Sequence, residues 1–205
     1  MEKFVITIGR QFGSGGRELG KVLAEKLGVP FYDKELMLEA AKKSGISPEF
    51  FVNNDERAPS FINGLIPFSF GHSPMSWYSG ASSISDDSLY KTQSDFIRSL
   101  AQQGSCVIVG RTADYVLRDM EGVVNVFLHA EPDDIARRVM ARSDCKDREK
   151  ALALAERTNK LRANYYNFYT DKKWGHASSY DLTFNTSRIP IPDIADLIIA
   201  YLGKR

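Results

Sequence analysis

The chain has 205 residues, 43% of them hydrophobic, which is enough for one substantial core and suits one α/β domain with a smaller appendage. Its 27 lysines and arginines nearly balance its 26 aspartates and glutamates, so no overall field favours a nucleic acid polymer or a membrane surface. No apolar run is long enough to span a bilayer. We therefore expect a cytoplasmic protein whose partners are small molecules, with no nucleic acid polymer and no membrane among them.

The cysteines and histidines do not suggest a metal site. Cys106 lies in an apolar run and Cys145 in a charged loop, so neither a disulfide framework nor a zinc cluster is expected. His72, His129 and His176 are not at the spacing of metal ligands. We expect no metal site built from side chains.

The first elements follow the order strand, helix, strand, helix. Residues 4–8 form an apolar strand pattern, and leucines recur at helical spacing over residues 19–27. Residues 31–32 make a very short strand candidate. Asp33 is then placed to cap a helix over residues 36–43.

A glycine-dense turn over residues 9–17 joins the first strand to the first helix. Such a turn exposes several backbone N–H groups, and the helix behind it adds its positive dipole end, so main chain alone can hold an anion such as phosphate. Arg17 adds a positive charge. The nucleotide-binding residues predicted here are Gly13, Ser14, Gly15, Gly16, Arg17 and Glu18.

The turn departs from the full P-loop pattern G-x-x-x-x-G-K-[ST]. In one register Gly16 takes the lysine place and Arg17 the hydroxyl place; shifted by one, Arg17 becomes the cation and Glu18 follows it. Either register leaves Mg²⁺ without its usual Ser/Thr ligand. The alternative is a glycine turn that merely connects a strand to a packed helix.

Residues 46–88 have no clean period and are rich in Ser, Gly, Pro, Asn and aromatic residues. The segment is too aromatic for a solvated linker and too irregular for a second core. We interpret it as a substrate-side insertion. A partly disordered loop is the alternative.

Strand and helix patterns then alternate to the end of the chain. The predicted elements are a helix over 89–103, strands over 106–110 and 123–128, a helix from Pro132, a long helix over 148–168, a strand over 180–185 and a helix over 192–202. This alternation predicts a mostly parallel sheet covered on both faces, with ligands at the carboxyl ends of the strands. Residues 9–17, Asp33, 110–111 and His129 all follow strands, so they should face one side.

Several arginines lie where they could close around phosphates. Arg111 directly follows a buried strand, Arg137 and Arg138 lie mid-helix with Arg142 one turn on, and Arg162 lies on the next helix with Lys160. Arginine suits this role because its rigid fork binds two phosphate oxygens and always stays charged. Arg142 and Lys160 are equally well explained as solvated helix residues.

The chain resembles the cytidylate kinase-like family of P-loop proteins over nearly its whole length. The residues that carry the likeness are 13–17, 109–111, 137–138, 160–166 and 180–182. The resemblance implies an α/β, three-layer P-loop NTPase-like fold in one domain over residues 1–205, with a five-stranded mostly parallel sheet. It also implies a substrate-binding insertion and an arginine-bearing lid, which we place at 46–88 and 132–168.

The resemblance also implies roles for single residues. Arg111 and Arg162 would bind the acceptor phosphate, although Thr112 replaces the aspartate that follows the arginine in cytidylate kinases. Asn159 stands where those enzymes have an aspartate that reads the cytosine edge. The predicted catalytic residues are Arg17, Arg137 and Arg138, and the predicted substrate-binding residues are Asp33, Arg111, Asn159 and Arg162.

The leading hypothesis is ATP-dependent phosphoryl transfer to a nucleoside monophosphate, CMP or dCMP above all, with ATP and Mg²⁺ as cofactors and Mg²⁺ carried by the nucleotide. One alternative is a catalytically silent nucleotide-binding sensor, which the missing lysine motivates. Another is a P-loop kinase for a different small metabolite. The sequence leaves open a homodimer.

Overall fold

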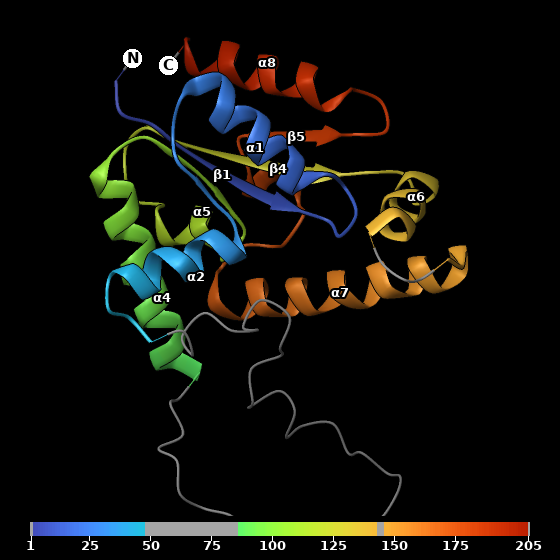
Figure 1. The fold of residues 1–205 in the computed structure, drawn as a ribbon, viewed down its shortest axis with the longest axis horizontal. Helices are drawn as coiled ribbons and strands as arrows, with labels where there is room; N and C mark the ends of the chain where they lie inside the picture. Colours follow the sequence, from blue (N-terminus) through green and yellow to red (C-terminus); the bar gives the residue numbers. More distant parts are fainter. Residues whose placement is uncertain (1, 48–85, 143–145, 205) are drawn as a thin grey trace, which may run out of the picture.

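The computed structural model describes residues 2–47, 86–142 and 146–204, and its centre is a five-stranded parallel sheet (Figure 1). The strands are β1 (Val5–Arg10), β2 (Phe31–Tyr32), β3 (Cys106–Val109), β4 (Val123–His129) and β5 (Leu182–Asn185). Their order across the sheet is β2-β3-β1-β4-β5, and every described pair is parallel. All five carboxyl ends therefore share one edge, as expected for a doubly wound sheet.

Helices cover both faces of this sheet. They are α1 (Gly16–Leu27), α2 (Lys34–Lys43), α4 (Asp86–Gln103), α5 (Ala113–Val116), α6 (Pro132–Arg142), α7 (Arg148–Tyr169) and α8 (Ile191–Leu202), with a 3₁₀ turn at Ala177–Ser179. In Figure 1, α1 and α8 lie on one side of the sheet, and α2, α4 and α5 lie on the other. The predicted three-layer α/β fold is thus confirmed.

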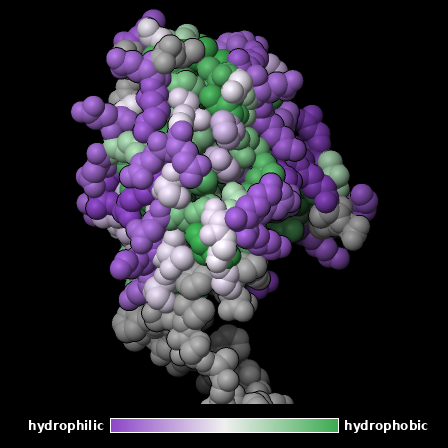
Figure 2. Space-filling model, turned by 60° about the vertical axis from the view of Figure 1, so that its left-hand side comes forward, coloured by the Kyte–Doolittle hydropathy of each residue, from purple (hydrophilic) through white to green (hydrophobic). Residues whose placement is uncertain are grey.

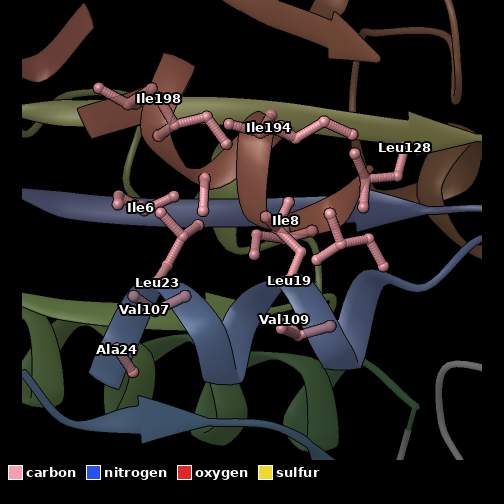
Figure 3. Close-up of a cluster of buried hydrophobic side chains, with 14 of the residues drawn as sticks. Ile6, Ile8, Leu19, Leu23, Ala24, Val107, Val109, Leu128, Ile194 and Ile198 are labelled. Carbon is pink, nitrogen blue, oxygen red and sulfur yellow. The ribbon is translucent and has the colours of Figure 1, made fainter. Parts of the chain in front are cut away.

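The larger core lies between the sheet and the α1 and α8 layer (Figure 3). Leu19 and Leu23 stand one helical turn apart on α1 and point toward Ile6 and Ile8 of β1 (Figure 3). All four side chains are fully buried, and α8 adds Ile194 and Ile198 to the same cluster. Burying each such side chain contributes about 1.5–3 kcal/mol, so this packing holds α1 against the sheet.

A second core fills the opposite face, where Ile108 of β3 meets Met37 of α2 and Ile97 of α4. A third, smaller cluster joins α6 to α7 through Ile135, Val139 and Ala155. The α6 and α7 pair, which covers most of the predicted lid at 132–168, is thus packed as one unit beside the carboxyl edge (Figure 1).

The elements predicted from the sequence are all present among the described residues, with ends shifted by a few positions. The short helix α5 was not predicted, because its four residues are too few to show a helical period. The last strand begins at Leu182 rather than at Tyr180, since the 3₁₀ turn precedes it. Most of the predicted insertion at 46–88 lies outside the described residues.

The face shown in Figure 2 carries hydrophilic residues on both flanks and a broken strip of hydrophobic residues between them. Among the described residues the exposed large hydrophobic side chains are Leu36, Leu154, Phe168 and Leu197, spread over α2, α7 and α8. No helix in the described part of the chain combines the length and apolar character needed to cross a membrane.

Candidate functional site

The turn between β1 and α1 forms a cradle at the carboxyl edge of the sheet. Gly13 and Gly15 take left-handed backbone angles, with φ of 80° and 87°, which glycine adopts without strain. Gly15 is the N-cap of α1, so no side chain caps the first turn. Because the first N–H groups of a helix have no acceptor within it, the amides that open α1 remain available to an anion.

The cradle is held in shape from three directions. The Asn159 side chain of α7 accepts a hydrogen bond from the Phe12 N–H at 2.7 Å. The Gln11 side chain accepts one from the Ala130 N–H, just after β4, at 3.3 Å. Beyond β5, the Thr186 hydroxyl donates to the Ser14 carbonyl at 2.9 Å. The turn is therefore preorganised before any ligand binds.

A cavity of about 350 Å³ opens in front of the cradle. Its cationic lining comes from β1, α1, α2, α6 and α7 and consists of Arg10, Arg17, Lys34, Arg138, Arg142 and Arg162. Its two carboxylates are Asp33 and Glu35. A cavity of this size falls in the range of small-molecule sites, and its excess of positive charge suits a polyanion.

Arg17 is tied to the start of α2. Its Nε lies 2.5 Å from Asp33 Oδ2, and its guanidinium also pairs with Glu35. Asp33 uses its other oxygen to cap α2, accepting from the Glu35 and Leu36 amides at 3.0 Å each. The predicted cap is confirmed, and the carboxylate that forms it also orients Arg17.

The adjacent arginines of α6 lie in different surroundings. Arg138 lines the cavity, and its Nη1 donates to Thr186 Oγ1 at 2.9 Å and to the Gly13 carbonyl at 3.5 Å. Arg137 is 72% exposed, pairs with Asp134 one turn earlier and does not line the cavity. Successive helix residues point about 100° apart, so only one of them can face the cradle.

A second, smaller cavity of about 30 Å³ lies behind the first, at the ends of β1 and β3. Arg111 lines it and is 2% exposed, with a left-handed φ of 63° that a side chain rarely adopts. Asp114 also lines it and accepts a hydrogen bond from the Tyr166 hydroxyl at 2.6 Å. Burial raises the pKa of the Asp114 carboxyl, and that hydrogen bond only partly opposes the rise.

Arg10 and Arg162 line both cavities, so they stand at the junction between them. Arg162 Nη1 donates to the Arg10 carbonyl at 3.4 Å, and its guanidinium lies 5.4 Å from the centre of the Phe12 ring. Arg17 and Arg111 line different cavities. Arg10 and Arg162 therefore connect the cavity lined by Arg17 to the cavity lined by Arg111.

The structure brings together most of the predicted site residues. Those that line the larger cavity are Gly13, Gly15, Gly16, Arg17, Asp33, Arg138 and Arg162. Ser14 is buried under the cradle, with its hydroxyl donating to the Gln11 carbonyl at 2.9 Å. Glu18 is exposed outside the lining, and Asn159 lies behind the loop. The catalytic and binding roles assigned to all these residues stay predictions.

Among the charged residues that line the larger cavity, Arg10, Lys34 and Glu35 had been given no role from the sequence. Lys34 and Glu35 follow Asp33 directly, at the end of a strand, so their position was a usable signal. Arg10 stands at the first glycine of the P-loop pattern in the register that puts Gly16 in the lysine place. An arginine in place of this glycine could also have identified Arg10 as a site residue.

Within residues 2–47, 86–142 and 146–204, no three His, Cys, Asp or Glu side chains gather as metal ligands. His129 ends β4 and His176 precedes the 3₁₀ turn, while His72 and Cys145 lie outside the described residues. Cys106 is buried in β3, and burial raises the pKa of its thiol to about 11. At neutral pH this thiol is protonated and a poor nucleophile.

Comparison with known proteins finds one matching family model and several structures of similar fold. The model of the cytidylate kinase-like family matches residues 5–188. A crystal structure of an uncharacterized protein from Eubacterium ventriosum is 30% identical, with a TM-score of 0.73 over 99% of this chain and all of that one. No curated protein matches the sequence.

More distant structures share the fold alone. Shikimate kinase from Bacteroides thetaiotaomicron is 17% identical, with a TM-score of 0.55 over 98% of both chains. A gluconokinase from Sinorhizobium meliloti is 15% identical, with a TM-score of 0.50 over 98% of this chain and 93% of that one.

Proposed function

The chain belongs to the cytidylate kinase-like family, and on that basis we propose that it transfers a phosphoryl group from ATP to a small acceptor, CMP or dCMP above all. The observation that carries the proposal is the larger cavity, where the opening amides of α1 and the guanidiniums of Arg138 and Arg162 border one space. Phosphoryl transfer needs little more than alignment of two polyanions and neutralisation of charge.

The donor phosphates would lie in the cradle of residues 13–18. Backbone amides there would bind phosphate oxygens, and Arg138 is already anchored beside them on Thr186. Such preorganised donors stabilise charge that develops in the transition state without reorganising at the moment of reaction. Of the three predicted catalytic residues, Arg17 and Arg138 line the cavity, whereas Arg137 would have to leave Asp134 and turn inward.

Mg²⁺ bound to ATP would neutralise part of the phosphate charge. This chain offers that ion no loop hydroxyl, because Arg17 takes the hydroxyl place and Ser14 is fully buried under the cradle. The ion would therefore keep mostly phosphate and water ligands, as Mg²⁺ commonly does.

The acceptor would lie toward the smaller cavity. Arg111 and Arg162 would hold its phosphate, and Asp33 lines the larger cavity at the start of α2. Two arginines near the acceptor favour an anionic one, since a bidentate fork matches phosphate oxygens. The named shikimate kinase and gluconokinase neighbours make shikimate and gluconate the relevant competing acceptors.

A second candidate function is a nucleotide-binding sensor without turnover. Gly16 in the lysine place is the observation that favours it. Such a module would keep the cradle and its arginines, bind ATP and transfer nothing.

An acceptor panel tests the proposal. ATP and Mg²⁺ are combined with CMP, dCMP, UMP, shikimate or gluconate, and ADP release is followed in a coupled assay beside calorimetric titration of each compound. We expect turnover with CMP or dCMP. Arg111→Met should raise the KM for that acceptor by about tenfold or more while ATP affinity stays within about threefold. ATP binding without ADP release in any mixture supports the sensor and contradicts the kinase.

A further inference from the structure

Arg10 and Gly16 exchange the residue types that the P-loop pattern places at their positions. The pattern has glycine at the first position and lysine at the sixth after it; this chain has arginine at residue 10 and glycine at residue 16. The glycine and the cation of the pattern thus occupy each other's positions in this loop. The packing around Gly16 gives a steric reason for the exchange.

The stem of Arg10 fills the space where a side chain at residue 16 would begin. A Cβ atom at Gly16 would lie 2.8 Å from both Cβ and Cγ of Arg10 and 3.5 Å from its Cδ. Gly16 has no left-handed φ, so its backbone does not require glycine. The Arg10 stem is what requires it.

The head of Arg10 reaches the end of β3. A Cβ atom at Gly110 would overlap Arg10 Nη1 and would lie 2.8 Å from its Cζ. The side chain therefore runs from the first residue of α1 to the residue after β3, with glycine at both points. It lines both cavities along this path, so its charge stands between the donor and acceptor positions.

We propose that Arg10 supplies the cation that the loop lacks at residue 16, and that it binds phosphate at the junction of the two cavities. This inference rests on the proposed function for the identity of the polyanion. A guanidinium at the junction can contact two phosphate oxygens at once, which suits a group that passes from donor to acceptor. On this proposal, glycine at residue 16 belongs to an intact phosphate site and does not indicate that phosphate binding has been lost.

Removal of the Arg10 charge is the first test. Arg10→Met keeps an unbranched stem, and Arg10→Gln is a second neutral variant in case the first does not fold. The probes are ATP and inorganic tripolyphosphate, titrated by calorimetry with thermal unfolding as a check on folding. We expect tripolyphosphate affinity to fall by about tenfold or more and turnover by about a hundredfold. Arg10→Lys should recover part of both.

The matched control is Arg98→Met, which removes an equal charge from an exposed i,i+3 pair on α4. It should leave tripolyphosphate affinity within about threefold of the parent. If the neutral Arg10 variants also stay within that range, Arg10 does not bind phosphate and the proposal is wrong.

Relocating the cation is the sharper test. Arg10→Gly combined with Gly16→Lys restores the usual order of the two residue types, so it should bind tripolyphosphate about tenfold more tightly than Arg10→Gly alone. Gly16→Lys alone should weaken binding, because its Cβ would meet the Arg10 stem. A double variant that binds no better than Arg10→Gly contradicts the exchange.

These outcomes separate the two proposals. If Arg10→Met loses tripolyphosphate binding and the parent phosphorylates no acceptor, the phosphate-binding role of Arg10 is supported and the kinase function is refuted. Full turnover of CMP by Arg10→Met supports the kinase and refutes Arg10. A parent that binds neither ATP nor tripolyphosphate overturns both.

Discussion

Arg17 pairs with carboxylates in the structure and is also the cation that we propose for the donor phosphates. Its guanidinium is 47% exposed and pairs with Asp33 and Glu35. The pair with Glu35 is exposed on both sides and contributes only about 0–1 kcal/mol, whereas the Asp33 side chain is 8% exposed and its carboxylate would lose its cationic partner if Arg17 moved away. Removing one preorganised donor to a developing oxyanion costs about 2.7–4 kcal/mol, so a phosphate could compete with these carboxylates for Arg17.

We expect Arg17→Ala to lower turnover by about a hundredfold, because it removes a donor to the phosphates. The free energy of unfolding should fall by about 1–3 kcal/mol, because the Asp33 carboxylate, whose side chain is 8% exposed, loses its cationic partner. Steady-state kinetics and urea unfolding measure the two effects. Glu35→Gln, which removes one partner and keeps Arg17, is the control. Turnover of Arg17→Ala within about threefold of the parent would exclude Arg17 from the reaction.

Among the elements, α7 determines the shape of the cradle although it lies far from it in sequence. Asn159 in the middle of α7 accepts the Phe12 N–H, and Arg162 one turn later donates to the Arg10 carbonyl. The helix thus contacts the loop on either side of Gln11. A movement of α7 would alter the phosphate site, and the small cluster that joins α7 to α6 would carry Arg138 with it.

Asn159→Ala should destabilise the protein by about 1 kcal/mol, because the Phe12 N–H loses its acceptor. ATP affinity should fall, while the ratio of turnover with CMP to turnover with UMP should stay constant. Asn159→Asp keeps an acceptor oxygen and should retain ATP affinity. Unfolding curves and the two acceptor assays give the measurements. A changed ratio with unchanged stability would instead support the base-reading role predicted from the sequence.

At the scale of the whole molecule, Asp114 and Tyr166 join α5 to α7 at the smaller cavity. Asp114 lies on α5, after β3, and Tyr166 lies on α7, and both side chains are buried beside Arg111 in the smaller cavity. Burial raises the pKa of Asp114, while Tyr166 and the charge of Lys172 oppose the rise. The folded protein therefore holds the Asp114 proton more tightly than the unfolded chain does.

This linkage predicts a pH-dependent stability. Since the folded pKa lies above the unfolded one, the contribution of Asp114 is complete below about pH 4 and is lost as pH rises through the raised value. Asp114→Asn removes this dependence and keeps an oxygen for Tyr166. Urea unfolding of both proteins between about pH 4 and pH 7 should show the parent losing stability relative to the variant. Parallel curves would refute the raised pKa.

Periodicity was a sound guide to most elements, because burial acts on side chains a few residues apart. The leucines of α1 reveal the face that this helix buries, and the apolar runs of β1, β3 and β4 indicate strands buried on both faces. Asp33 could be identified as a cap because the capping bond closes within three residues. The α5 helix could not be predicted in this way, because its four residues are too few to show a helical period.

The α/β architecture, the cradle and the family of this protein follow from its sequence alone, because strand and helix periods, turn glycines and caps are local physics. Which arginines border the cavity does not follow from the sequence. Arg138 rather than Arg137 borders the cavity because α6 packs on α7 through one face. Arg10 crosses from Gly16 to Gly110 because two glycines far apart in sequence leave room for it, and only the folded chain brings them together.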